Sequence, residues 1–410
     1  MLRRILEVAG GLVGIVAITV AATQLEPMPL PRLTDVEPPR EQRLVCMPPA
    51  SGTLYAQAEE RLTLATMDGE AAEREATTVE DVGSQPFTLR GVQPAGGVRV
   101  DDAFVGCQLP AASGILQVAD ASVSELLIIN PDATDAAVDL SLYGPDGEVL
   151  ALGSRGIVVS PQRSRTIALS VLAGQEGPIG VGFSTSRGRV AVVAVTEDGA
   201  ATTPTSAADR HLIPGIAKNV PAQLILSNPG TERATAEVYV LGANARFQPS
   251  GGAGLSIPAG ASHAVDLTLG LAGELGAIEV LSDREIGATV IGGTSGAMNP
   301  ARPGQRLRAF GPGGGALQLS NPSEESVSLV VSVATDGGAA ADTTVVVPAG
   351  TTVAATLPDS GESLVTVASP APVLGALVYP SNGTVAVIPL NADLSEDAEP
   401  IRAELAPTLR

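Results

Sequence analysis

The chain has 410 residues with 24 lysines and arginines against 44 aspartates and glutamates, a formal net charge of −20. Such an acidic surface repels phosphate backbones, so nucleic acid is not expected as a partner. Hydrophobic residues make up 44% of the chain, which excludes a disordered acidic tail, and two cysteines are too few for a disulfide-built mini-domain.

The N-terminus has the pattern of an export segment. Arg3 and Arg4 precede an uncharged run at 8–22, which is shorter than the roughly 20 residues that a transmembrane helix needs. The run fits a signal peptide with cleavage near Ala22, and flanking apolar residues extend it toward a signal anchor. We therefore expect 1–25 to be a signal peptide or signal-anchor helix. The rest of the chain is then exported, and is either tethered to the cytoplasmic membrane by this one helix or secreted.

A proline-rich spacer is expected next, at 26–45. Two lone cysteines in an oxidising compartment most often pair, so Cys46 and Cys107 are expected to form a disulfide. The bond would close an N-terminal β region at 46–115. Within that region, the segment 57–75 comes nearest to a helical pattern anywhere after the N-terminus.

A threefold repeat is the strongest pattern in the chain. Asn130, Asn228 and Asn321 each end an apolar run and precede a proline, at intervals of about 95 residues. The positions 8, 10 and 12 residues after each asparagine are apolar, which is the period of a strand with one buried face. An asparagine before proline favours an extended backbone and its amide can cap a turn, so these three are expected as structural repeat positions. A fourth Asn-Pro, at Asn299, lacks the apolar run and is expected in a linker.

Each copy continues with the same succession of strand signals. A strand ends before Pro161, Pro258 and Pro348, because proline cannot continue a central ladder. A serine four residues before a β-branched residue then closes each copy and predicts a hairpin; the pairs are Ser186 and Val190, Ser282 and Ile286, and Ser369 and Val373.

The expected fold class is all-β, with tandem immunoglobulin-like β-sandwich repeats behind the N-terminal signal or anchor helix. The alternative is a β-propeller, because half a repeat, about 45 residues, has the length of a propeller blade. The expected domains are sandwich repeat 1 at 116–200, repeat 2 at 212–296 and repeat 3 at 308–392, followed by an acidic tail at 393–410.

No catalytic, cofactor-binding or metal site is expected. His211 and His263 have no triad or metal partner nearby in the sequence, and the chain has no Gly-x-Ser-x-Gly, phosphate-loop or His-Glu-x-x-His motif. The acidic loop at 131–135 was weighed as a Ca²⁺ site, but it lacks the ligand spacing of known calcium loops. We therefore expect no enzyme activity and no cofactor.

Three segments together carry a resemblance: 136–147, the Val-Pro-Ala-Gly strand end at 347–350, and Ser-x-x-Pro-Val at 369–373. They resemble an uncharacterised family, a domain of unknown function, found in membrane-anchored, exported tandem β-sandwich proteins of high-G+C Gram-positive bacteria. The resemblance covers 46–391. Family members often carry aromatic residues ahead of the first Asn-Pro, where this chain has Gly-Ile-Leu at 114–116. The resemblance implies an exported protein with a tandem β-sandwich architecture, and it assigns no activity.

The expected function is that of a non-enzymatic, envelope-associated interaction or scaffold protein, with an unknown envelope protein as partner. The alternative is binding of cell-wall glycan, with a cell-wall polymer as partner. The chain has no tryptophan and four tyrosines, which argues against stacking sugars on aromatic faces. Asn, Asp and Arg side chains could still bind a glycan through hydrogen bonds. A contiguous exposed apolar patch favours a protein partner, and a groove lined by Asp, Asn and Tyr favours glycan.

Overall fold

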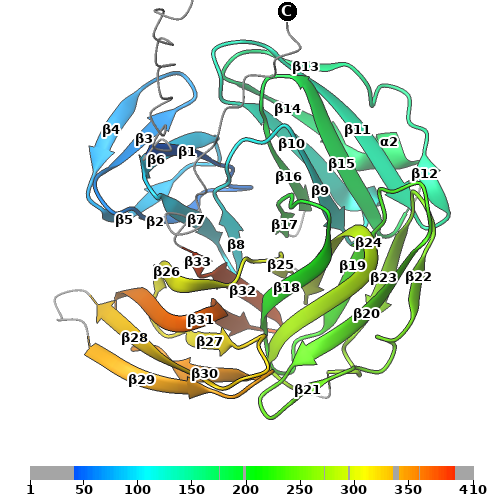
Figure 1. Cartoon of the computed structure of the whole chain (residues 1–410). Helices are drawn as coiled ribbons and strands as arrows, with labels where there is room; N and C mark the ends of the chain where they lie inside the picture. Colours follow the sequence, from blue (N-terminus) through cyan, green and yellow to red (C-terminus); the bar gives the residue numbers. More distant parts are fainter. Residues whose placement is uncertain are drawn as a thin grey trace, which may run out of the picture. The chain divides into compact units, whose positions relative to one another are not determined.

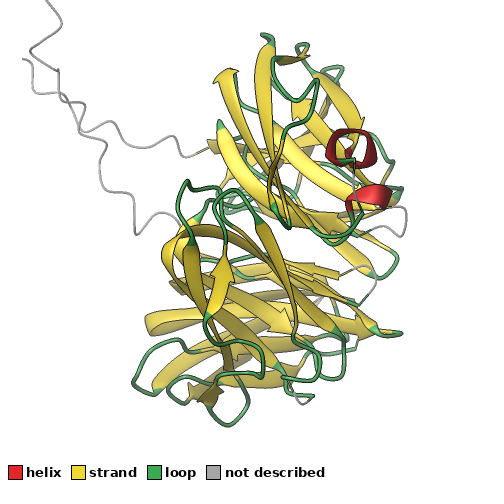
Figure 2. Cartoon of the chain, turned by 90° about the vertical axis from the view of Figure 1, so that its right-hand side faces the viewer, coloured by secondary structure: helices red, strands yellow, loops and turns green. Residues whose placement is uncertain are grey.

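The computed structural model describes residues 41–174, 176–196, 200–271, 273–293, 296–335, 341–359 and 361–392. These residues are almost entirely strands, with two short helices, η1 (Ala121–Val123) and α2 (Leu169–Ala173) (Figure 2). The expected all-β class is therefore confirmed. The expected N-terminal helix at 1–25 and the acidic tail at 393–410 lie outside the described residues.

The strands form four consecutive modules, which we call N, 1, 2 and 3. Module N contains β1 (Glu41–Cys46), β2 (Gly52–Gln57), β3 (Leu62–Thr66), β4 (Ala71–Arg74), β5 (Thr77–Val82), β6 (Phe87–Val92), β7 (Ala95–Val100) and β8 (Ala103–Gly106). Module 1 contains β9 (Ser113–Val118), β10 (Ser124–Asn130), β11 (Ala136–Gly144), β12 (Gly147–Val149), β13 (Ile157–Val159), β14 (Arg163–Ala168), β15 (Ile179–Arg187), β16 (Ala191–Thr196) and β17 (Ala201–Thr202).

The two later modules are built likewise. Module 2 contains β18 (Ala208–Ile216), β19 (Ala222–Ser227), β20 (Ala234–Leu241), β21 (Arg246–Phe247), β22 (Leu255–Ile257), β23 (Ser262–Asp266), β24 (Gly276–Gly292) and β25 (Gly296–Met298). Module 3 contains β26 (Gly304–Pro312), β27 (Ala316–Ser320), β28 (Val327–Thr335), β29 (Ala341–Val347), β30 (Thr352–Thr356), β31 (Glu362–Ser381), β32 (Thr384–Pro389) and β33 (Asn391–Ala392). The first strand of each repeat begins a few residues before the expected boundary.

All four modules share one strand plan. We letter the strand positions a to h in chain order, with β12 and β13 of module 1, and β21 and β22 of module 2, sharing position d because each pair lies beside strand c. Each module then has a first sheet in the order d-c-f-a and a second in the order e-b-g-h. In module N these sheets are β4-β3-β6-β1 and β5-β2-β7-β8, and every neighbouring pair is antiparallel. The Asn-Pro pattern therefore identifies three copies in the sequence, whereas the fold contains four.

The hairpin expected at the end of each copy is wrong. Positions f and g do not pair with each other, because f lies between a and c in the first sheet while g lies between b and h in the second. In modules 2 and 3 they are one continuous strand, β24 or β31, which passes from one sheet to the other. The four-residue spacing from the serine to the β-branched residue therefore marks the point at which the chain passes from the first sheet to the second.

Module N corrects two further expectations. The segment 57–75, the nearest to a helical pattern, forms β3 and β4, because Leu62 and Leu64 alternate inward against Leu89 of β6. The last residues of the expected spacer at 26–45 belong to β1. Module N is thus a complete two-sheet copy, not a partial domain, and it was missed because it lacks the Asn-Pro mark.

The central strands of the second sheet are covered on both faces. Inside module 1, Leu126 and Ile128 of β10 point into the core shared by its two sheets. Their neighbour Ile129 points the other way and joins a second buried cluster with Val45 and Met47 of module N. A strand buried on both faces explains why the run at 126–129 before Asn130 is continuously apolar instead of alternating.

The contacts between modules close a ring within the compact unit Arg40–Glu396. Gln108 of module N donates to the Val192 carbonyl of module 1 at 2.8 Å, and Thr352 of module 3 donates to the Leu241 carbonyl of module 2 at 2.6 Å. Strands β9 and β15 of module 1 contact β19 of module 2, and β26 of module 3 contacts β2 of module N. The inner strands β8, β17, β25 and β32 meet in the middle (Figure 1). The β-sandwich-like repeats therefore stand around a common centre.

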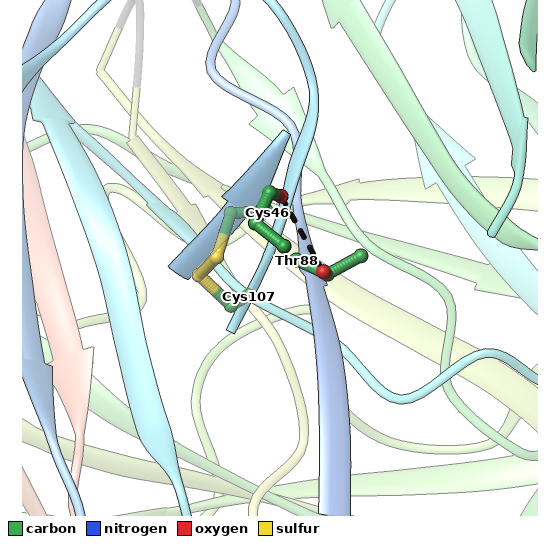
Figure 3. Close-up of a disulfide and its surroundings, with 4 residues drawn as sticks. Cys46, Thr88 and Cys107 are labelled. Atoms are coloured by element: carbon green, nitrogen blue, oxygen red, sulfur yellow. Dashed lines mark hydrogen bonds between the residues drawn. A yellow bond between two sulfur atoms is a disulfide. The ribbon is translucent and has the colours of Figure 1, made fainter. Parts of the chain in front are cut away.

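The expected disulfide joins Cys46 and Cys107, with their Cα atoms 4.2 Å apart. Cys46 ends β1 in the first sheet of module N, and Cys107 follows β8 in the second, so the bond ties the two sheets together at their inner edges. Figure 3 shows it beside Thr88 of β6, whose hydroxyl donates to the Ala65 carbonyl at 3.4 Å.

Replacing both cysteines, as Cys46→Ser with Cys107→Ser, is expected to lower the free energy of unfolding by about 4 kcal/mol. Opening a loop of this length restores conformational entropy to the unfolded chain. Urea unfolding of the variant against the oxidised protein measures the loss, and the dithiothreitol-treated protein serves as the chemical control. An unchanged urea midpoint would contradict the stabilising role.

Candidate functional site

The inner ends of the four modules enclose a cavity of about 420 Å³, a size typical of small-molecule sites. Module N lines it with residues of β1, β2, β7 and β8, and module 3 with residues of β26, β32 and β33. The chain segments 201–205 of module 1 and 297–302 of module 2 complete the wall. No single module forms this cavity, because each contributes one side of it.

The wall is rich in side chains that hydrogen-bond without carrying a charge. It holds two threonines, Thr203 and Thr205, and a set of carboxamides: Gln42, Gln57, Gln93, Gln108, Asn299 and Asn391. Most of the other lining residues are apolar, among them Leu44, Phe104, Met298, Phe310, Ile388 and Leu390. Although the chain has 44 acidic residues, none is among the described residues that line this cavity. The wall therefore mixes apolar and hydrogen-bonding side chains and does not repel an anion.

Gln57 is the most deeply buried of these carboxamides, with 2% of its surface exposed. Along β2, Leu54 and Ala56 point into the core of module N, so alternation turns Gln57 to the opposite face. Neither its Nε2 nor its Oε1 has a hydrogen-bond partner among the described residues. Buried amides are nearly always hydrogen-bonded, and an unpaired one lowers stability by about 1–3 kcal/mol. Both atoms are closed to solvent, so Gln57 places an unsatisfied buried amide in the wall of the cavity.

Two arginines give the wall its charge. Arg308 is half-buried and its guanidinium contacts Glu59 at 3.1 Å and the Gln93 Oε1 at 3.2 Å, so its charge is compensated. Arg302 is exposed and forms no ion pair with any residue in the described part of the chain. Leu109 and Asn391 are also exposed, and with Arg302 they mark the side on which the cavity meets solvent. The entrance thus carries one uncompensated positive charge on a strongly acidic protein.

The three repeat asparagines lie elsewhere, at the turn after strand b of each module. Asn130 Nδ2 donates to the Thr134 carbonyl at 2.7 Å and the Val159 carbonyl at 2.9 Å, and its Oδ1 accepts from the Asp132 amide at 3.1 Å. Asn228 and Asn321 repeat these contacts and all three side chains are fully buried. Each fastens the turn after strand b to the end of strand d, so their role is structural.

Module N carries Ala58 at the equivalent position. The Ala58 amide donates to the Ala76 carbonyl before strand e, as the Asn228 amide donates to the Ala261 carbonyl in module 2. The backbone arrangement therefore persists without the asparagine side chain. This explains how module N keeps the strand plan while it lacks the sequence mark.

Substituting Asn228→Ala is expected to lower the free energy of unfolding by about 2–3 kcal/mol. The change leaves the buried Ile257 carbonyl and the Gly230 amide without their partner, and each lost bond contributes about 1 kcal/mol. Urea denaturation measures it. Gln223→Ala, a half-buried residue on β19 of the same module, is the control and should change stability little. Equal effects of the two substitutions would refute the capping role.

The structure keeps the two histidines apart. His263 is exposed on β23. His211 is buried on β18, where its Nε2 donates to the Ile286 carbonyl at 2.6 Å. Burial lowers the pKa of His211 below its usual value, since the charged ring would lose solvation. Neither histidine lines the central cavity.

Stability is expected to fall as pH drops below about 6.5. Unfolded His211 binds a proton in that range, whereas the folded state, with its lowered pKa, resists doing so. The limit for one proton is about 1.4 kcal/mol per pH unit. Unfolding free energies at pH 7.5 and 5.5 should differ less in His211→Gln than in the parent. His263→Gln should behave like the parent, and a matching flattening there would disprove the assignment.

Both aspartates of the acidic loop at 131–135 are paired with arginines. Asp132 forms an ion pair with Arg43 of module N, and Asp135 contacts Arg187 at 3.5 Å. Across the described residues, no group of three potential ligands stands close enough to hold a metal ion. No helix in that same part of the chain is long and apolar enough to cross a membrane.

A second, larger cavity of about 680 Å³ lies along β3, β4 and β5 and against 162–164 of module 1. Four of its charged residues are paired, with Arg74 at 2.6 Å from Glu80 and Arg163 at 3.1 Å from Asp68, while Glu70 forms no ion pair within the described residues. The central cavity differs in drawing its wall from all four modules and in having no carboxylate among its described lining residues. We take it as the candidate site.

Sequence reasoning found none of the central cavity. Its residues come from strand ends and linkers that share no motif, and Asn299, set aside as a linker residue, is among them. There its Nδ2 donates to Thr203 Oγ1 at 2.9 Å, which joins modules 1 and 2. The sequence signal that agrees with an uncharged wall is that the segments 93–97 and 203–205 contain no charged residue.

Comparison with known proteins gives a family of unknown function. No curated protein matches the sequence. A solved structure described as a tetra-tandem repeat in the extending region of a large adhesion protein is 11% identical, with 89% of this chain and 98% of that chain covered. Its TM-score is 0.13, too low to carry an argument. The model of a family of unknown function (DUF5719) matches residues 103–358, more than half of the sequence. The chain therefore belongs to this family of unknown function.

Proposed function

We propose that this protein is a non-enzymatic, exported interaction or scaffold protein of the cell envelope. The observation that carries the proposal is a set of exposed apolar side chains on module 1. Leu150, Leu152 and Val171 have 91%, 99% and 80% of their surfaces exposed. Their neighbours Ala151 and Leu172 pack against the same core, which anchors both segments to one module. Exposed apolar side chains gathered on one module favour a protein partner.

The proposal includes the finer points of architecture and origin. Each module is a variant of the immunoglobulin-like sandwich in which the sixth strand position leads directly into the opposite sheet. Residues 1–25 tether the ring to the cytoplasmic membrane of a high-G+C Gram-positive bacterium. The charge pattern of Arg3 and Arg4 before the apolar run supports this orientation.

In-cell crosslinking of a C-terminally tagged copy in the native host, followed by detergent extraction and mass spectrometry, tests the proposal. A stoichiometric envelope protein is the expected product. The double substitution Leu150→Ser with Leu152→Ser should reduce its yield several-fold. Leu269→Ser, equally exposed but on module 2, is the matched control and should leave the yield unchanged. Recovery of the bare protein, or of wall polymer alone, would overturn the scaffold role.

Glycan binding is the second candidate, and the central cavity favours it. Carboxamides, hydroxyls and arginine are the groups that hydrogen-bond sugars, and they gather here from all four modules. The wall contains asparagine as a glycan groove was expected to, but neither aspartate nor tyrosine. Co-sedimentation of the protein with insoluble cell-wall polymer would separate this role from protein scaffolding.

A further inference from the structure

We propose that the outer edge of β29 in module 3 binds an extended, basic segment of another protein as an additional strand. The inference rests on the proposed interaction role, and it names a second contact surface and the chemistry of its partner. Three features of this edge carry it: its unpaired backbone, its exposed valines, and the purely acidic sequence around it.

The first feature is a full-length strand with one unpaired side. β29 pairs with β28 over seven residues, from Val347 opposite Val327 to Ala341 opposite Val333. No other strand in the described part of the chain pairs with β29, which lies at the rim of module 3 (Figure 1). Every second residue of such a strand turns its backbone N–H and C=O groups away from the sheet, where another extended chain can pair with all of them.

The other modules protect the same position, strand d. In module N, β4 has only four residues and ends in Arg74, which pairs with Glu80. Modules 1 and 2 divide the position into pieces of two or three residues, β12 with β13 and β21 with β22. Short strands, charges and interruptions are the usual protection of a sheet edge, and β29 has none of them after Asp342.

The other outer edge of module 3, β30, is already engaged by module 2 at its start. The Thr352 amide donates to the Gly242 carbonyl at 2.9 Å, and the Thr352 hydroxyl donates to the Leu241 carbonyl at 2.6 Å. Among the described residues, no hydrogen bond links β29 to another module. β29 is therefore the outer edge of module 3 that is open along its length.

The second feature selects apolar side chains in the partner. Val346 has 59% of its surface exposed, and Val330 on β28 has 40%. Both lie on the outer face of the sheet, because Val346 is opposite Ser328 and Val330 lies two residues further along β28. On the other face, Val345 packs only partly against the core of module 3. A strand added beside β29 would cover these valines with side chains from alternate positions.

The third feature selects positive charge. The sequence contains no lysine or arginine from 309 to 392. Exposed carboxylates flank the edge, since Asp342 lies near the start of β29 and Glu325 precedes the β28 residues that pair with its end. A strand with basic residues at its two ends would be attracted by both carboxylates. A second copy of this chain, with a net charge of −20 and the same acidic strand, would be repelled.

The test uses the purified full chain in detergent and three end-capped peptides, measured by isothermal titration calorimetry. The basic peptide is Lys-Val-Thr-Val-Thr-Val-Lys. The acidic peptide has Glu in place of both Lys, and the third is the basic peptide with its five interior amides N-methylated, which keeps its charge and removes its backbone donors. We expect the basic peptide to bind, the acidic one to bind about tenfold more weakly, and the N-methylated one to show no binding.

Hydrogen exchange measured by mass spectrometry locates the added strand. The amides at 342–347 that point away from β28 should exchange more slowly when the basic peptide is bound, because the peptide then accepts hydrogen bonds from them. The amides of β13, which occupies strand position d in module 1, should exchange at the same rate with and without the peptide.

A matched pair of variants tests the edge itself. Val346→Lys places a positive charge on the exposed face of β29, as natural edge strands often do, and should weaken the basic peptide about tenfold. Val158→Lys is the control, because Val158 is 50% exposed on β13 of module 1, and it should leave the affinity unchanged. Both side chains are exposed, so both variants should keep the melting temperature of the parent.

The inference is overturned if the basic peptide does not bind, if the N-methylated peptide binds as tightly, or if Val346→Lys binds like the parent. A dimer in analytical ultracentrifugation that Val346→Lys dissociates would also overturn it, because a second copy would then occupy the edge. The titration needs no envelope partner. An envelope protein recovered by crosslinking beside a negative titration would therefore show that only this inference has failed.

Discussion

The structure depends on the central strands b and g of each second sheet, which are buried on both faces. A β-sandwich module normally leaves the outer face of each sheet to solvent, with polar residues alternating along its strands. Here Ile129 of β10 and Val193 of β16 are as deeply buried as their inward neighbours, because module N covers the outer face of that sheet. The same holds where module 3 contributes Val385 and Val387 to the core of module 2. A sheet that needs cover on both sides needs neighbours on both sides, and a closed ring is the arrangement in which every module has them.

Carboxamides recur where modules meet. Outside the central cavity, Gln117 accepts from the Thr289 hydroxyl at 2.7 Å, and Gln318 donates to the Ile216 carbonyl at 3.1 Å. In the cavity wall, Gln108 donates to the Val192 carbonyl at 2.8 Å and stands among apolar side chains such as Leu44, Phe104 and Leu390. Gln57 differs from these three in that neither of its amide atoms has a partner among the described residues.

Much of the module could be predicted from the sequence, because its signals are local. Asn228 with its proline, the alternation through Val238, and Pro258 each fix one turn or strand by the conformation they allow. The path between strands f and g could not be predicted, since Ser282 and Ile286 look alike whether the chain turns back or crosses to the opposite sheet. The cavity was also out of reach, because Gln57 and Arg302 are brought near one another by ring closure and by nothing in their own segments.

Ring closure also sets an order of events during synthesis. The ion pair between Glu59 of module N and Arg308 of module 3 joins residues 249 positions apart. Module N can therefore complete its contacts with module 3 only after module 3 has been synthesised. Contacts of such long separation form late, and surfaces left open meanwhile are prone to wrong associations. Tyr55 of module N belongs to such a surface, because its partner in the finished ring is Phe310 of module 3, whose ring lies edge-on to it with the two centroids 6.2 Å apart. The bond between Cys46 and Cys107 lies wholly inside the first module, so it can form as soon as that module has folded and stabilise it until module 3 completes the ring.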